Sequence, residues 1–152
     1  MNKVLKFRVG EAPPKAGPEL SSSAIVAKHT VKYRALDRET FVLIFLNAKN
    51  HVIDTEVHAI GSIDSSAVYP REVFRSAILK NAASIICVHN HPSGDPEPSP
   101  CDREITRSLV HAGALLQIKV LDHIIITPGE AYYSFGDNGI IEEFQADAVF
   151  NS

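Results

Sequence analysis

The architecture of this chain is decided by Ser84-Ile-Ile-Cys-Val-His-Asn-His-Pro-Ser-Gly-Asp-Pro-Glu-Pro-Ser-Pro-Cys-Asp102. The apolar run over 84–89 predicts a short buried strand. Four prolines and a glycine within 91–100 prevent regular structure, so the strand is expected to end in a rigid loop. A helix is predicted to begin at Ser99 or Pro100, because serine favours the N-cap and proline the first helical position. This helix is predicted to stop at Gly113, which suits a left-handed cap.

The rest of the chain continues this alternation of strands and helices. β-branched and aromatic runs bounded by turn residues predict further strands over 41–46, 51–60, 118–127 and 132–135, with turns at 47–50 and 136–139. Helices are expected over 21–36, capped by one of three serines, and from Pro70, with an apolar face made by Val73, Phe74, Ala77, Ile78 and Ala82. The tail after residue 141 gives no signal. We therefore predict an α/β sandwich with a mixed, largely antiparallel sheet flanked by helices.

Length and composition favour a single domain. A chain of 152 residues that is 45% hydrophobic and 22% charged can bury a continuous core without disulfides. The prolines between Glu11 and Glu19 predict an irregular segment. The expected organisation is a flexible arm over 1–20 and one domain over 21–152.

Charge and cysteine usage narrow the function classes. The 15 Lys and Arg residues against 18 Asp and Glu residues give no basic excess, so nucleic-acid binding is expected to be weak or indirect at most. Cys87 and Cys101 form neither a C-x-x-C pair nor a disulfide framework, which is typical of a cytoplasmic protein. Neither an export signal nor an apolar run of roughly 18 to 20 residues is found, so no membrane association is expected.

The pattern His89-x-His91 at a strand end suggests a metal site. Alternate strand residues point to the same side, so both imidazoles can serve one ion. Asp102, in the first turn of the next helix, can reach back over the loop and complete a three-ligand set. Zinc sites with three protein ligands keep a fourth position for water and are catalytic. Two alternatives remain: a plain pair of surface or core histidines, and a helix-capping role for Ser99 and Asp102.

Three other polar positions need an interpretation. Glu56 interrupts an apolar strand, where a carboxylate lies on the solvent face or beside a cation. Asp122 and His123 are adjacent in a strand and face opposite sides, so a supporting role is favoured over a catalytic dyad. Cys87 shares the face of His89 and is interpreted as a buried core residue.

The motif His89-Asn-His-Pro-Ser-Gly94, followed by Pro98-Ser99 and Asp102, resembles the signature of the RadC-like branch of the JAMM (MPN/JAB) metalloprotease superfamily. The resemblance covers roughly residues 35 to 136. It extends through Asp37-Arg-Glu39, Phe41 to Asn47, Pro70-Arg-Glu-Val-Phe74, Asn81-Ala-Ala83 and Leu121-Asp-His-Ile-Ile125. It implies a cytidine-deaminase-like, JAB1/MPN fold.

The resemblance also implies a site and an activity. His89, His91 and Asp102 would hold Zn²⁺, Ser99 would stabilise the tetrahedral intermediate, and an upstream glutamate would activate the attacking water. We assign that glutamate to Glu56, in preference to Glu39 and Glu72.

The expected function is that of a zinc metallopeptidase or isopeptidase with a protein or peptide substrate. The alternative is a DNA-repair-associated module that binds nucleic acid or acts as a scaffold without catalysis. The chain is expected to lack the N-terminal helix-hairpin-helix segment of longer RadC proteins, and its oligomeric state is left open.

Overall fold

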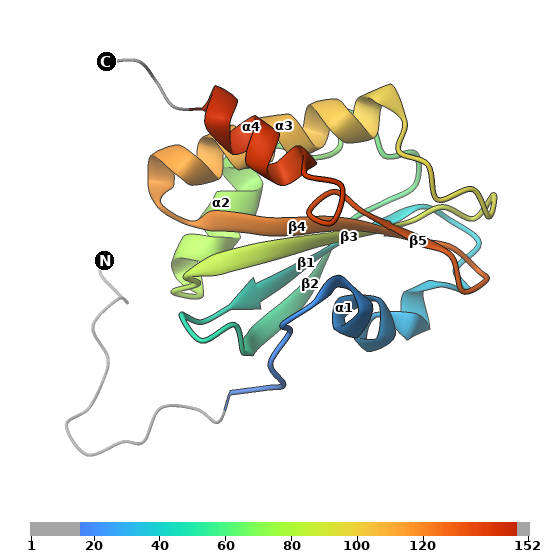
Figure 1. Cartoon of the computed structure of the whole chain (residues 1–152), viewed down its shortest axis with the longest axis horizontal. Coiled ribbons are helices and arrows are strands. Elements are labelled where there is room, and N and C mark those ends of the chain that lie inside the picture. Colours follow the sequence, from blue (N-terminus) through green and yellow to red (C-terminus); the bar gives the residue numbers. More distant parts are fainter. Residues whose placement is uncertain (1–15, 149–152) are drawn as a thin grey trace.

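A computed structural model of the chain describes residues 16–148 and shows one five-stranded sheet with helices on both faces (Figure 1). The strands are β1 (Thr40–Leu46), β2 (Val52–Ile60), β3 (Ser84–Asn90), β4 (Lys119–Ile126) and β5 (Tyr132–Ser134). The helices are α1 (Ser23–His29), the short 3₁₀ helix η1 (Val31–Tyr33), α2 (Pro70–Leu79), α3 (Pro100–Leu116) and α4 (Ile140–Asp147).

The strand order is β2-β1-β3-β4-β5. β3 and β4 run parallel and are joined through α3, whereas β1 pairs antiparallel with β2 and β3, and β5 pairs antiparallel with β4. The prediction of a mixed, largely antiparallel sheet is therefore confirmed. No helix within residues 16–148 combines the length and the apolar character needed to cross a bilayer.

Two hydrophobic cores lie on opposite faces of the sheet. The larger core packs side chains of α2, α3 and α4 against the sheet, and the smaller one packs α1 and Leu20 against the other face (Figure 1). The central strands β1 and β3 are buried on both sides, which explains why their sequences are continuous apolar runs. This burial fixes the position of β3, whose end carries the histidine motif.

Several expected boundaries are corrected. The first helix is capped by Ser22 as expected, but it ends at His29 and not near residue 36, because Thr30 leaves the helix and its hydroxyl donates to the carbonyl oxygen of Val26. The side chain of Ile78 is exposed and does not belong to the buried face of α2. The tail after residue 141, for which the sequence predicts no element, contains most of α4.

Part of the expected arm packs on the sheet. Gly17 and Leu20 donate backbone hydrogen bonds to Val52 and Asn50, and the carbonyl oxygen of Pro18 accepts one from Val52. Residues 17–20 thus lie against the end of the β1–β2 hairpin. Residues 1–15 of the expected arm lie outside the described residues.

The prediction that the second long helix stops at Gly113 is wrong. The helix continues to Leu116, and Gln117 provides the left-handed cap with φ 59°. Gly113 is required for another reason: a Cβ atom there would overlap the carbonyl oxygen of Ile118 and lie 3.2 Å from the ring of Phe74. The glycine therefore permits close packing of α3 inside the helix instead of ending it.

This packing predicts a stability difference between two glycine variants. Gly113→Ala is expected to lower the free energy of unfolding by about 1–3 kcal/mol, because backbone must shift to admit the methyl group. Gly129→Ala is the matched control, since a Cβ there meets nothing within 4 Å; a change within about 0.5 kcal/mol is expected. Urea unfolding followed by circular dichroism measures both. Equal stabilities for the two variants would show that the contact at Gly113 is unimportant.

Candidate metal centre

A cluster of histidine and carboxylate side chains lies where β3 ends and α3 begins. In α/β units of this kind, ligands bind at the carboxyl ends of the strands, beside the helix N-termini. A cleft of about 410 Å³ opens at this point. Its lining consists of Glu39, Ile63, His91, Pro92, Ser93, Asp95, Glu97, Ser99 and Asp102.

His89 is the buried member of the pair, with 1% of its surface exposed. Its Nδ1 lies 3.3 Å from Asp102 Oδ1 and its Nε2 lies 3.6 Å from Glu39 Oε1, but neither contact has the geometry of a hydrogen bond. Both ring nitrogens are thus buried without a hydrogen-bond partner, which costs free energy in a folded protein. A cation bound between one of these nitrogens and a carboxylate would remove the cost at that nitrogen.

His91 faces the same centre, and its ring centroid lies 4.8 Å from that of His89. The Nδ1–H group donates to the carbonyl oxygen of Asp95 at 2.8 Å. Hydrogen bonding at Nδ1 orients a histidine so that Nε2 can serve as a ligand. That Nε2 lies 3.1 Å from Asp102 Oδ2. Burial lowers the pKa of His91, but the hydrogen bonds to Asp102 and Asp95 outweigh it and raise the pKa above its usual value.

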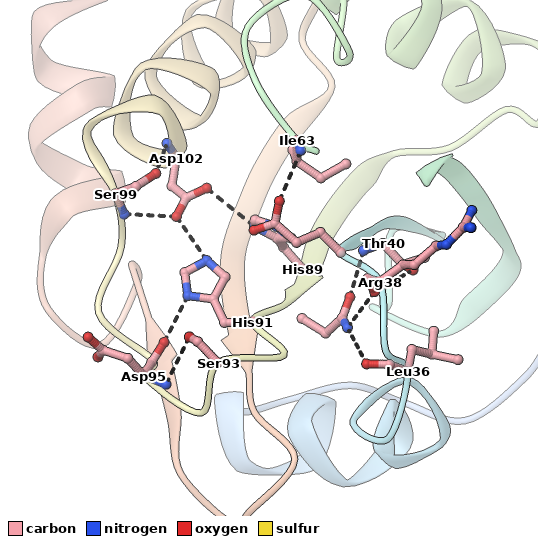
Figure 2. A network of polar contacts seen from close by, with 12 residues as sticks. Leu36, Arg38, Thr40, Ile63, His89, His91, Ser93, Asp95, Ser99 and Asp102 are labelled. Atoms are coloured by element: carbon pink, nitrogen blue, oxygen red, sulfur yellow. Dashed lines mark hydrogen bonds and ion pairs between the residues drawn. The ribbon is translucent and has the colours of Figure 1, made fainter. Parts of the chain in front are cut away.

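Asp102 joins the two histidines and caps α3 at once (Figure 2). Its side chain is 2% exposed, and Oδ2 accepts a hydrogen bond from the backbone N–H of Ser99 at 2.8 Å. Burial opposes ionisation, but the nearby His89 ring and the hydrogen bonds from His91 and the backbone of Ser99 hold the pKa of Asp102 well below its usual range. The carboxylate is therefore ionised, so the capping and metal-binding interpretations are compatible.

Ser99 completes the capping box. Its hydroxyl oxygen accepts the backbone N–H of Asp102 at 3.0 Å. The hydroxyl hydrogen stays available, because the oxygen acts only as acceptor in this bond. Ser99 lines the cleft, so its side chain can donate to a bound molecule there.

The structure brings Glu39, and not Glu56, to the histidines. Ligand atoms of Glu39, His89 and His91 lie within 4.8 Å of one another, a spacing that could hold a metal ion. One oxygen of Glu39 accepts the backbone N–H of Ile63 at 3.1 Å and the other faces His89. Glu39 directly precedes β1, and the pairing of Phe41 with His89 places it beside the histidine motif.

Glu56 lies elsewhere on the sheet. It pairs with Leu43 in β1, which in turn pairs with Cys87 in β3, so two strand spacings separate Glu56 from Cys87. At about 4.8 Å per spacing, this is roughly 10 Å. Its carboxylate instead accepts a hydrogen bond from the Ser76 hydroxyl of α2 at 3.3 Å. The structure thus places Glu39 beside the histidines and Glu56 away from them.

Asp122 and His123, adjacent in β4, have different surroundings. Asp122 accepts hydrogen bonds from Ser134 and from the backbone of Gly136, and it makes no contact with the His123 ring. The His123 ring lies 2.6 Å from the Thr106 hydroxyl and stacks on Phe135. Burial, together with the neighbouring His89, lowers the pKa of His123 to about 3, so it stays neutral.

Cys87 is a buried member of the larger core, as the sequence suggested. Burial raises the pKa of its thiol far above the usual value, so it stays protonated and is a poor metal ligand.

The electrostatic character of the cleft favours a cation. Its lining contains four carboxylates, those of Glu39, Asp95, Glu97 and Asp102, and no lysine or arginine. Two imidazoles and one or two carboxylates are a ligand set that zinc accepts. The residues present at the strand end therefore fit a divalent metal.

Comparison with known proteins places this chain in a family. A UPF0758 protein of Shouchella clausii is 54% identical over 96 residues, which is 63% of this chain and 42% of that protein. A UPF0758 protein of Methanosarcina mazei is 49% identical over 111 residues, 73% of this chain and 48% of the relative. One of Symbiobacterium thermophilum is 44% identical over 137 residues, 90% of this chain and 58% of the relative.

The chain thus spans about half the length of these relatives. The family model described as the RadC-like JAB domain matches residues 20–140, which include every element of the centre described above. The chain belongs to the RadC-like JAB domain family.

Proposed function

We propose that the chain is a zinc-dependent hydrolase that cleaves a peptide or isopeptide bond. The observation that carries the proposal is His89: its two ring nitrogens are buried, lack hydrogen-bond partners and lie between two carboxylates. Such an arrangement is costly unless a cation joins the groups. Membership of the JAB domain family supports the same interpretation.

The two carboxylates have different environments, which assigns them different roles. Asp102 is 2% exposed, is held by the backbone of Ser99 and contacts both histidines, so it is the third ligand with His89 and His91. The side chain of Glu39 is 35% exposed, and only one of its oxygens accepts a hydrogen bond. Glu39 can therefore reach a water molecule in the cleft and act as the base.

When bound, zinc would supply a Lewis acid that lowers the pKa of water and polarises a carbonyl group. Glu39 accepts the proton of the attacking water and later returns it to the leaving amine. The Ser99 hydroxyl, whose hydrogen is free, donates to the oxyanion that develops on the substrate. Asp95 keeps His91 oriented through the hydrogen bond at Nδ1.

The proposed substrate is a peptide and not nucleic acid. Lysine and arginine supply most of the electrostatic affinity for nucleic-acid phosphates, and the residues that line the cleft include neither. The cleft is open, and the acidic side chains of Asp95 and Glu97 at its rim favour a substrate that carries positive charge.

The proposal is tested on the full chain after removal of metal with a chelator. We expect that adding zinc produces cleavage in a complex peptide mixture, detected by mass spectrometry as new termini, and that a second chelator treatment abolishes it. A chain that binds zinc but yields no zinc-dependent cleavage would contradict the hydrolase proposal and favour a binding module.

A further inference from the structure

Strands β1 and β3 separate at the candidate metal centre. Their backbone pairing ends at Phe41 and His89. Beyond this pair the chain after β3 stays beside β4, because the backbone N–H of His91 donates to Ile126 at 2.8 Å. The residue before Phe41, Thr40, pairs with β2 and not with β3. A gap therefore opens between the two strands where the cleft residues lie.

The side chain of Asn90 spans this gap. Asn90 lies between the two histidines and is 1% exposed. Its Oδ1 accepts the backbone N–H of Thr40 at 2.6 Å, and its Nδ2 donates to the carbonyl oxygen of Arg38 at 2.9 Å and to that of Leu36 at 3.4 Å. Arg38 and Thr40, both labelled in Figure 2, are the residues directly before and after Glu39 in the chain.

We propose that Asn90 is a positioning residue that holds Glu39 at the metal centre. The amide fixes the backbone on either side of Glu39, and the Ile63 N–H fixes one carboxylate oxygen, which leaves the other oxygen 3.6 Å from His89 Nε2. This inference rests on the proposed function, in which Glu39 is the base. Positioning matters because a base acts only within hydrogen-bond reach of the proton that it removes.

The chemistry of the gap requires an amide at this position. The Thr40 N–H needs an acceptor and the Arg38 carbonyl needs a donor, and a primary amide offers both at once. Aspartate has the same shape but offers no donor when ionised, and it would place a second buried negative charge near Glu39. Alanine offers neither group.

The test compares three variants of the full chain: Asn90→Ala, Asn90→Asp and the control Asn47→Ala. Asn90→Asp keeps the acceptor for Thr40, so it serves if the alanine variant does not fold. Asn47 is a matched control because its side chain also accepts backbone N–H groups, from Lys49 and His51, at the opposite end of β1. Circular dichroism confirms the fold of each variant.

The first readout needs no enzymatic activity. Carbon-13 NMR of labelled glutamate and histidine side chains is recorded before and after zinc is added. In the wild type and in Asn47→Ala, zinc is expected to shift the Glu39 carboxyl resonance and those of the histidine rings. In the Asn90 variants the histidine shifts should remain and the Glu39 shift should fall to less than half.

The second readout is the hydrolytic rate in a double-mutant cycle with Glu39→Gln. If Asn90 acts through Glu39, Asn90→Ala slows hydrolysis in the wild type but has no further effect in the Glu39→Gln background. A role that is merely structural would slow both backgrounds equally.

The outcomes separate the two proposals. Absence of zinc-induced histidine shifts in the wild type would sink the proposed metal site. Normal histidine shifts with an undiminished Glu39 shift in both Asn90 variants would overturn the positioning role while leaving the metal site intact. Equal slowing of both backgrounds in the cycle would overturn it as well.

Discussion

Glu39→Gln is expected to leave zinc bound and to lower the rate of hydrolysis by about 10²- to 10⁴-fold, the usual contribution of general acid–base catalysis. The amide keeps the size of the side chain and an acceptor for the Ile63 N–H, but it cannot take a proton from water. Because Asp102, His89 and His91 are unchanged, the metal should remain. Steady-state hydrolysis and metal analysis of the same preparation measure both quantities.

The matched control is Glu56→Gln, the same substitution in the carboxylate that sequence reasoning preferred. Glu56 is hydrogen-bonded to Ser76 and lies two strands away from β3, so the activity and zinc content of Glu56→Gln should stay near wild type. Full activity in Glu39→Gln together with a large loss in Glu56→Gln would restore the original assignment. Loss of zinc from Glu39→Gln would instead make Glu39 a ligand.

The second large effect is expected on zinc affinity when a proposed metal ligand is replaced. Asp102→Asn should weaken zinc binding by more than about 100-fold, because even outer hydrogen-bond partners of ligands contribute 10- to 100-fold. The asparagine oxygen can still accept the Ser99 N–H, so α3 keeps part of its cap. His91→Ala should lose zinc to a similar extent. Titration of the apo chains with zinc against a competing chelator measures the affinities.

Glu97→Gln is the control for charge alone. Glu97 also lines the cleft, but its side chain is exposed, whereas that of Asp102 is buried against both histidines. The zinc affinity of the Glu97→Gln variant should change little. The contrary result is informative too: if Asp102→Asn retains tight zinc binding and Glu39→Gln loses it, the metal is held by Glu39, His89 and His91.

The local parts of the centre were predictable because short stretches of sequence fix their geometry. Alternate residues of a strand share a face, which placed His89 beside His91, and the first turn of a helix after a rigid loop placed Asp102 over the strand end. The serine that caps α3 was likewise readable from S-x-x-D.

The parts that the sequence alone does not supply depend on tertiary structure. Choosing Glu39 over Glu56 requires the register between β1 and β3, in particular the pairing of Phe41 with His89, and periodicity alone does not supply a register. Gly113 was interpreted as a helix end because its close contacts with Ile118 and Phe74 are invisible in the sequence. The role of Asn90 depends on the gap between two strands, which no local pattern reveals.

The central claim is that residues 89 to 102 form a metal centre, and zinc stoichiometry tests it most directly. The full chain, purified without added metal and without an affinity tag that binds metal, is analysed by inductively coupled plasma mass spectrometry. It is then stripped with a chelator and titrated with zinc. We predict about one tightly bound zinc per chain after titration, in keeping with a single set of three protein ligands. A chain that folds normally, contains no zinc and takes up none on titration would contradict the account.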